Sequence, residues 1–494
     1  MEHKLKSWQN WLIFGVAMAF IFVSGVVISS LLEHKADVAS VVYHPKVEIS
    51  GVEARSSVFG KDYPREYQTW IDTAATGLPN SFNGKIAADV LEQRPEMVIL
   101  WAGYSFAKDY RTPRGHMYAV DDVVHSLRTG APMSGADGLQ QPASCWLCKS
   151  PDVPRMMETI GVDSFYHNKW AALGDEIVNP IGCADCHEPK NMDLHISRPT
   201  LVEAFQRRGK DVDKATPQEM RSLVCAQCHA EYYFEGEKKR PAYPWDKGLT
   251  VEAIEEYYDE TGFTDYTHKL SRAPILKAQH PDYELFQIGI HGQRGVSCAD
   301  CHMPYNEEGG VKYSDHHIQN PLVVVERTCQ TCHRDSKETL RKNVYDRQQK
   351  ADELRALLEA ELAKAHIEAK FAWDNGAAEN EMKEVLLLIR QAQWRWDFAV
   401  ASHGGSFHAP QETMRILGHG LNRAYQARMA IGKVLVSHGY TDDVPLPDIS
   451  TKEKAQQYIG LDMPAERAAK NKFLKEVVPK WLQEAKVKGR IAAK

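Results

Sequence analysis

Ten cysteines fall into five C-x-x-C boxes, and these boxes are the most specific chemical signal in the sequence. The boxes read CWLCK, CADCH, CAQCH, CADCH and CQTCH, and they begin at Cys145, Cys183, Cys225, Cys298 and Cys329. They use every cysteine of the 494-residue chain, so no cysteine is left for a scattered disulfide framework. Four boxes end in histidine, whereas the first ends in lysine.

Three kinds of site use paired cysteines: zinc knuckles, redox dithiols and covalent haem attachment. Zinc would require the cysteines to combine in fours and hence the boxes in pairs, and five boxes cannot all be paired. A redox dithiol normally occurs once, at a strand-to-helix junction. Only haem attachment explains the histidine, because two thioethers hold the porphyrin and the adjacent histidine ligates its iron. The four boxes therefore predict iron ligation by His187, His229, His302 and His333.

The first box differs because it ends in Lys149. An iron with histidine on both sides only carries electrons, whereas an iron with one protein ligand can bind substrate on its other side. Lysine must lose its proton to ligate iron, and its reference pKa is about 10.4. A haem fixed by Cys145 and Cys148 could offset that cost. The simpler alternative is a lysine that points to solvent, but four haem boxes downstream favour a fifth haem with Lys149 as ligand. The predicted haem-attaching residues are Cys145, Cys148, Cys183, Cys186, Cys225, Cys228, Cys298, Cys301, Cys329 and Cys332.

The N-terminus predicts export. Residues 11–32 contain no charged side chain, and about 20 apolar residues span a bilayer. A cleavable signal is the alternative, but the apolar run is long for one and no clear A-x-A site follows. We therefore predict a signal-anchor helix over residues 1–32, and in either case a body on the periplasmic side of the membrane. A net charge of −6 without a long basic run argues against nucleic acid as a partner.

The rest of the chain predicts a mainly α-helical protein. Residues 33–338 hold the boxes and should form short helices and loops with little sheet. Residues 339–494 should form long helices that pack on the haem domain, because Leu354, Leu358 and Leu362 recur at helical spacing.

Ala365 continues this apolar face. Further helices are predicted over residues 377–402 and 412–437, and after Pro464, which suits a first turn. The broad apolar faces of these helices indicate a scaffold and, beyond that, a homodimer interface.

One CWxCK box followed by four CxxCH boxes resembles the pentahaem cytochrome c nitrite reductases, which form ammonium. The resemblance covers most of the predicted exported chain and extends beyond the boxes. The shared segments are LWAGYSFAKDYRTPRGHMYAV, SLRTGAP, CHAEYYF, LKAQHPDYE, GIHGQRG, YSDHHIQNP and SFHAP.

The resemblance implies a substrate pocket at the first haem, formed by Arg128, Tyr232 and His280. Their chemistry agrees, because arginine binds a small anion and the other two can donate protons. Without the resemblance, each residue would more often have another role. Arg128 would form an ion pair, Tyr232 would be an aromatic core residue, and His280 would ligate another haem. The resemblance also implies calcium, bound by the residues Glu231, Tyr232, Lys277 and Gln279. Calcium prefers oxygen ligands, which the side chains of Glu231 and Gln279 would supply. The backbone carbonyls of Tyr232 and Lys277 would supply the others.

The resemblance further implies a distal histidine for each histidine box. His116 is expected to serve the third box, His291 the fifth and His408 the fourth. For the second box the DHHI segment offers two neighbours, of which alignment favours His316 over His317. His403 is a weaker competitor for the place of His408.

The predicted function is six-electron reduction of nitrite to ammonium, with hydroxylamine as a side substrate. The expected cofactors are five haems c and calcium, and the expected donor is a membrane-anchored multihaem quinol-oxidising cytochrome. Two alternatives stay open at this point: an electron-transfer cytochrome without substrate, and a related reductase of sulfite or another oxyanion. The first alternative requires a sixth ligand at the first haem.

Overall fold

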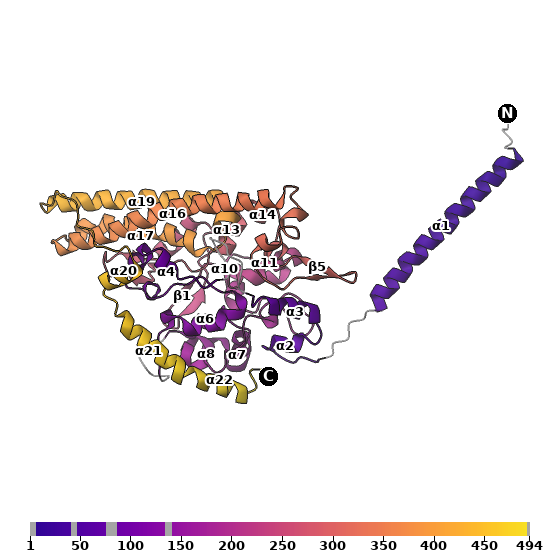
Figure 1. Cartoon of the computed structure of the whole chain (residues 1–494), viewed down its shortest axis with the longest axis horizontal. Coiled ribbons are helices and arrows are strands. Elements are labelled where there is room, and N and C mark those ends of the chain that lie inside the picture. The colour runs from indigo at the N-terminus through magenta and orange to yellow at the C-terminus, as the bar shows by residue number, and fades with distance from the viewer. Residues whose placement is uncertain (1–5, 41–46, 76–85, 134–140, 492–494) are drawn as a thin grey trace. The chain divides into compact units, whose positions relative to one another are not determined.

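The chain forms two compact units, Met1–Glu48 and Ile49–Lys494. The structure, a computed structural model, describes residues 6–40, 47–75, 86–133 and 141–491, with the backbone alone for 33–40 (Figure 1). Residues 1–5 of the predicted anchor lie outside the described residues. The predicted boundary between residues 338 and 339 falls inside the larger unit.

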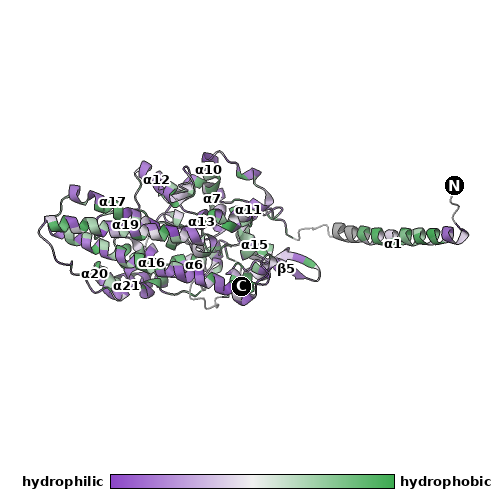
Figure 2. Ribbon diagram, turned by 90° about the horizontal axis from the view of Figure 1, so that it is seen from above, coloured by the Kyte–Doolittle hydropathy of each residue, from purple (hydrophilic) through white to green (hydrophobic). Residues whose placement is uncertain are grey.

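Helix α1 (Ser7–Ser40) dominates the smaller unit. Its Ser7–Leu32 part has a mean hydropathy of 2.5 and none of it is buried, and in the described part of the chain it alone is long and apolar enough to cross a membrane. Figure 2 shows hydrophobic residues along most of this helix. An apolar helix of this kind serves either as an anchor or as a signal sequence.

Three long helices form one side of the larger unit and lie side by side in Figure 1. They are α16 (Lys337–Asp374), α17 (Glu379–Ala401) and α19 (Pro410–Ser437). The hydroxyl of Ser336 caps α16 by accepting a hydrogen bond from the Thr339 N–H, as expected for an N-cap serine. The long helices predicted from the apolar spacing are therefore confirmed.

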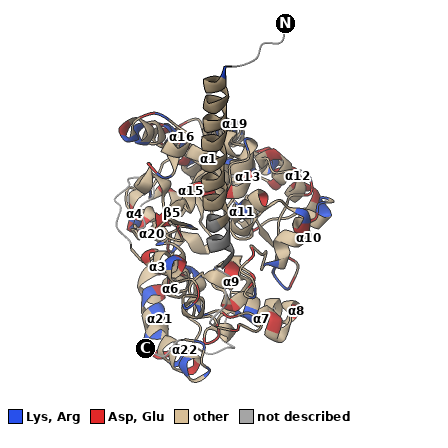
Figure 3. Ribbon diagram, turned by 90° about the vertical axis from the view of Figure 1, so that its right-hand side faces the viewer, with Lys and Arg blue, Asp and Glu red and all other residues tan. Residues whose placement is uncertain are grey.

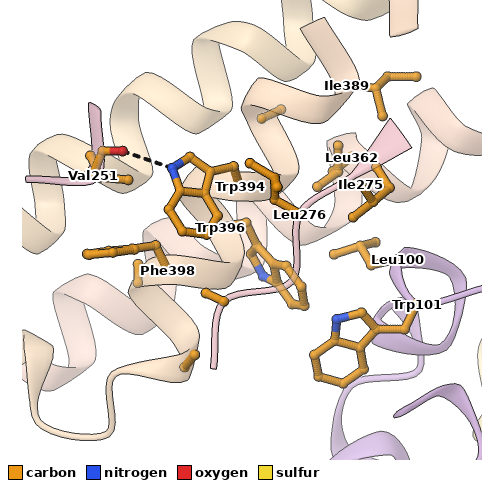
Figure 4. Packing of buried hydrophobic residues seen from close by; sticks show 14 of the residues in the cluster. Leu100, Trp101, Val251, Ile275, Leu276, Leu362, Ile389, Trp394, Trp396 and Phe398 are labelled. Carbon is orange, nitrogen blue, oxygen red and sulfur yellow. Dashed lines mark hydrogen bonds between the residues drawn. The ribbon is translucent and has the colours of Figure 1, made fainter. Parts of the chain in front are cut away.

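The core of this layer comes from the predicted apolar face of α16 and from aromatic residues of α17. Leu358, Leu362 and Ala365 are fully buried. Trp394 and Trp396 of α17 are buried beside them, and the Trp394 indole donates a hydrogen bond to the backbone oxygen of residue 251 at 2.9 Å (Figure 4). Buried indoles with satisfied N–H groups add apolar area without an unpaired donor.

Strands are few and short, which confirms the predicted mainly α-helical fold. Three antiparallel pairs are present among the described residues, and their registers place Tyr233 opposite Ala242, Tyr266 opposite Ile275 and Tyr305 opposite Ser314. The strands are β1 (Tyr233–Glu235), β2 (Arg240–Ala242), β3 (Tyr266–Thr267), β4 (Pro274–Ile275), β5 (Tyr305–Glu308) and β6 (Val311–Ser314).

Short helices separated by loops connect these elements and carry the cysteine boxes. The α-helices are α2 (Ser56–Phe59), α3 (Pro64–Asp72), α4 (Val90–Gln93), α5 (Glu96–Leu100), α6 (Ala119–His125), α7 (Asp152–Ile160), α8 (Val162–His167), α9 (Cys183–Cys186), α10 (Pro199–Arg207), α11 (Pro217–Ala226), α12 (Val251–Thr261), α13 (Asp282–Ile288), α14 (Ile290–Gln293), α15 (Cys298–His302) and α18 (Gly405–His408). The 3₁₀ turns are η1 (Ser105–Ala107), η2 (His116–Tyr118), η3 (Leu127–Thr129), η4 (Ala143–Trp146), η5 (Trp170–Leu173), η6 (Val212–Lys214), η7 (Pro321–Val324) and η8 (Cys329–Thr331).

The chain ends in three helices, α20 (Lys452–Tyr458), α21 (Met463–Glu476) and α22 (Val478–Val487). Pro464 lies in the first turn of α21, as predicted. Phe473 of α21 is buried against Trp170, in a second apolar cluster around the first box. Charged residues of both signs are interspersed over the larger unit (Figure 3).

A close approach between the long helices generates a test of their packing. A methyl group on Gly420 of α19 would come within 2.8 Å of the Leu358 side chain and 3.2 Å of the Arg395 Cβ. A methyl group on Gly418, in the same helix, would meet nothing within 4 Å. Gly420→Ala should therefore be less stable than Gly418→Ala by about 1–3 kcal/mol, the usual cost of overpacking. Denaturant unfolding of the two haem-loaded variants, followed by circular dichroism, measures the difference, and equal midpoints would contradict this packing.

Candidate functional site

A cavity of about 1480 Å³ in the larger unit is lined by residues of all five cysteine boxes. Protein interiors are close-packed and contain few voids larger than a water molecule, so a space of this size marks the place of a bound group. None of the ten cysteines, all of which lie in the described residues, forms a disulfide. A cavity lined by thiols and imidazoles fits covalently attached porphyrins.

Four pairs of imidazole rings lie in and around this cavity at nearly equal separation, and every ring except that of His333 belongs to its lining. Two imidazoles on one iron should have centroids roughly 6.2 Å apart, because each metal–nitrogen bond is about 2 Å and each nitrogen lies about 1.1 Å from its ring centre. The observed centroid distances are 6.1 Å for His116–His229, 6.1 Å for His187–His316, 6.4 Å for His302–His408 and 6.2 Å for His291–His333. Each pair joins a box histidine to the distal histidine expected for it.

Backbone carbonyls orient several of these rings. The Nδ1 atom of His187 lies 2.7 Å from the Met192 oxygen, that of His302 lies 3.0 Å from the oxygen of residue 319, and that of His316 lies 2.9 Å from the oxygen of residue 314. A carbonyl only accepts, so Nδ1 carries the hydrogen and the lone pair is on Nε2, as metal-ligating histidines require. Burial also lowers the pKa of His302 to about 4, so the ring is neutral.

Neither His403 nor His317, the alternatives to His408 and His316, faces the histidine of a cysteine box in these pairs. The ring of His403 lies 5.0 Å from that of His280, and His408 rather than His403 faces His302. His317 follows His316, but it is the ring of His316 that faces His187.

Arg128 lies on the 3₁₀ turn η3 and lines the cavity. Its backbone N–H and its Nε both donate to the Ser126 hydroxyl, at 3.2 and 3.1 Å, and that hydroxyl donates to Asp109 Oδ2 at 3.2 Å. The guanidinium carbon lies 4.4 Å from the centre of the Phe106 ring, a cation–π distance. The Nε edge and one face of the guanidinium are therefore held by the chain.

His280 also lines the cavity, and its orientation depends on Asp282 at the start of α13. His280 Nε2 lies 3.0 Å from Asp282 Oδ2. Burial would raise the pKa of Asp282, but hydrogen bonds from His229 and His280 hold it well below its usual range. Burial lowers the pKa of His280, and nearby His229 lowers it further, while Asp282 opposes both. The H-x-D spacing was visible in the sequence, but the role of its aspartate was missed.

Tyr232 and Lys149 complete the predicted site residues near the first box. Tyr232 immediately precedes β1, and burial raises its pKa well above the usual value, so the phenol keeps its proton. Lys149 lines the cavity beside Cys148, and its backbone N–H donates to the oxygen of Trp146 at 2.9 Å.

A buried group of carboxylates fits a cation. Glu231 is fully buried, and its Oε2 accepts a hydrogen bond from the Gln279 N–H at 2.7 Å. The Gln279 amide reaches the Lys277 carbonyl at 3.0 Å, and the Lys277 N–H donates to Asp265 Oδ2 at 2.8 Å. Burial raises the pKa of Glu231 well above its usual range and that of Asp265 to about 7. One buried and one half-buried carboxylate among carbonyl oxygens form a set suited to calcium, and sequence reasoning missed Asp265.

The Lys277 side chain is directed away from this oxygen set. Its Nζ lies 2.8 Å from Asp397 Oδ1 of α17, and 5.3 and 4.9 Å from the ring centres of Trp101 and Phe106. The ammonium is thus neutralised by Asp397, while the Lys277 carbonyl stays with the oxygen group. Phe106 contacts both this ammonium and the Arg128 guanidinium.

Comparison with known proteins gives consistent matches along the chain. Residues 55–489 match the family model described as cytochrome c552. A cytochrome c-552 of Bacteroides thetaiotaomicron is 70% identical over 494 residues, covering 100% of both chains, and one of Porphyromonas gingivalis is 64% identical, covering 100% of this chain and 99% of that one. The solved catalytic subunit of cytochrome c nitrite reductase from Desulfovibrio desulfuricans, described with two calcium sites, matches with a TM-score of 0.75 and 30% identity over 85% of this chain and 91% of that chain.

Proposed function

We propose that this chain, which belongs to the cytochrome c552 family and is an ammonia-forming nitrite reductase, reduces nitrite at the haem of its first box, with Lys149 as the iron ligand. The observation that carries this proposal is the exception among the boxes. The histidine of each of four boxes is paired with a second imidazole, whereas none of these four pairs includes Lys149, and Arg128 and His280 line the cavity in which this lysine lies. When bound, the first haem supplies an open iron position for substrate, and the other four supply the path for electrons.

Arg128 is proposed to bind the anion. Its N–H groups that do not face Ser126 offer charge-assisted hydrogen bonds to nitrite oxygens. Ser126 and Asp109 hold the Nε edge, and Phe106 lies against the guanidinium, so the remaining donors have a fixed direction. A held guanidinium loses less side-chain freedom when substrate arrives.

His280 and Tyr232 are proposed as proton donors. Reduction of nitrite to ammonium and two waters takes up six electrons and eight protons, so protons must arrive repeatedly while the N–O bonds break. Asp282 accepts from the imidazole of His280 and orients it, which makes Asp282 a positioning residue. Tyr232 retains its phenol proton and can donate a hydrogen bond. Hydroxylamine, which lies late on the same reduction, is a proposed side substrate.

The test of this site uses His280→Asn and Arg128→Ala in haem-loaded enzyme. We expect His280→Asn to lower nitrite turnover by roughly 10²–10⁴-fold, the range for positioned acid–base groups. Arg128→Ala should lower turnover at least tens-fold and raise the KM for nitrite. Ammonium production with a reduced viologen dye measures both.

His167→Asn is the matched control, because His167 is exposed on α8. It should retain full activity. Full haem content with unchanged turnover in His280→Asn and Arg128→Ala would remove both residues from the mechanism.

We propose that the four facing imidazole pairs ligate the remaining haem irons. The second box provides the sharpest test, because two adjacent histidines compete. His316→Ala should leave His187 without a facing imidazole and convert one low-spin haem to high spin. His317→Ala should leave the spectrum unchanged. Electron paramagnetic resonance of both oxidised variants measures this, and the reverse result would transfer the ligand role to His317.

Calcium is proposed to bind the oxygens of Glu231, Tyr232, Lys277 and Gln279. It would join the segment that carries Tyr232 to the segment that carries His280, and it would neutralise Glu231 and Asp265. The Glu231→Ala variant should contain less calcium per haem, and an unchanged ratio would contradict the assignment.

A homodimer through the long helices is proposed from a row of exposed apolar residues. Tyr425, Met429 and Val436 of α19 are 46%, 66% and 60% exposed, and their spacing places them on one face of the helix. Exposed apolar rows of this kind mark protein interfaces. Monomeric mass in light scattering at micromolar concentration would contradict this dimer.

The electron donor is proposed to be a membrane-anchored multihaem cytochrome that oxidises quinol at the periplasmic face. The support is the apolar Ser7–Leu32 helix, which would place the larger unit at that face either as an anchor or as an export signal. Quinol-dependent nitrite reduction in membranes should require both proteins, and activity without the second cytochrome would contradict this donor.

A further inference from the structure

The C-terminal helices contact the turn that carries Arg128. Lys470 of α21 is 3% exposed, and its Nζ donates to the Gly130 carbonyl at 2.7 Å and to the Thr129 hydroxyl at 3.1 Å. These acceptors are the two residues that follow Arg128. Lys470 also lines the same cavity as Arg128.

Both acceptors are oriented for this lysine. The Thr129 hydroxyl donates its own hydrogen to the backbone oxygen of Val123 at 2.8 Å, so its lone pairs are available to the amine. Gly130 has φ +70° and ψ −164°, a conformation that only glycine adopts readily, and this conformation sets the direction of its carbonyl. The contact therefore fixes the backbone just after the arginine.

A second contact from the C-terminal region holds the segment before Asp109, the residue that supports Arg128 through Ser126. The Gln456 amide of α20 donates to the backbone oxygens of Ala107 and Lys108, at 3.0 and 3.2 Å. The next residue, Asp109, accepts from the Ser126 hydroxyl, which in turn accepts from Arg128. The turn is thus held on one side through Asp109 and on the other by Lys470.

The surroundings of Lys470 keep its amine in place in either protonation state. The Nζ lies 5.0 Å from the ring centre of Phe473 and 5.7 Å from that of Trp170. Burial lowers the pKa of Lys470 to about 7, and Asp109 opposes this shift. A neutral amine still has two N–H donors, enough for the bonds to Thr129 and Gly130.

We infer that Lys470 is a positioning residue for nitrite binding, which acts by holding the Thr129–Gly130 backbone so that Arg128 keeps its direction toward the substrate. This inference rests on the proposed role of Arg128. Helix α21 would thus contribute to the affinity for nitrite, although its own sequence contains no binding motif.

The test compares Lys470→Met with wild-type haem-loaded enzyme. Methionine keeps the apolar length of the side chain and removes the donors, so the half-buried Thr129 hydroxyl and Gly130 carbonyl lose this partner. We expect the KM for nitrite to rise about tenfold, in line with the loss of two hydrogen bonds, while kcat changes by less than about threefold. Amide hydrogen exchange of the peptide over residues 126–131 should become faster.

Lys472→Met is the matched control, because Lys472 is exposed on the same helix. It should change neither the KM nor the exchange. A normal KM in Lys470→Met, or a raised KM with unchanged exchange over residues 126–131, would overturn the inference.

A double-mutant cycle separates positioning from general stability. If Lys470 acts through Arg128, adding Lys470→Met to Arg128→Ala should raise the KM no further, because coupled residues are not additive. Additive losses would overturn the inference. Wild-type kinetics in Arg128→Ala alone would instead overturn the proposed role of Arg128, so the two failures are distinguishable.

Discussion

Four pairs of imidazole rings, 6.1–6.4 Å apart, set the geometry around which the larger unit is built. An iron between two imidazoles tolerates little change in this separation, so each pair ties together two segments that the chain must bring close. His302 of α15 faces His408 of α18, which leads directly into α19. The proposed ligation of these pairs would link the long helices to the cysteine boxes, in addition to apolar packing. Such a link agrees with the single compact unit that the predicted haem region and the long-helix region form.

Contacts of the Lys277 ammonium connect the proposed calcium site to the proposed substrate site. Lys277 contributes its carbonyl to the proposed calcium site, while its ammonium pairs with Asp397 and lies near Phe106. The guanidinium of Arg128 lies against the same ring. A buried ammonium that lost Asp397 would be an uncompensated charge, typically a cost of about 3–5 kcal/mol. The α17 carboxylate thus supports both the oxygen group and the aromatic ring behind the arginine.

Much of this molecule could be predicted from its sequence, because covalent haem attachment leaves an explicit motif. The boxes and the resemblance predicted the family, the helical fold and the cofactors, and the comparisons confirm these predictions. The apolar spacing of Leu358 and Leu362 predicted a buried helix face, which is confirmed.

Other residues left no such signal. Asp265 and Ser126 contact residues close in space, and neither type nor spacing distinguishes them from ordinary surface polar residues. Lys470 lies far along the chain from the turn that it contacts, and in the sequence it is one lysine among many in a charged helix. Such contacts depend on tertiary packing, which periodicity does not encode.

The position of Lys470 near the end of the chain has a consequence for biogenesis. A chain exported from its N-terminus would carry the box ending in Lys149 and the Arg128 turn across the membrane before α21. If Lys470 holds that turn, a truncated protein would contain the first box without a finished anion site. Affinity for substrate would then develop only on completion of the polypeptide.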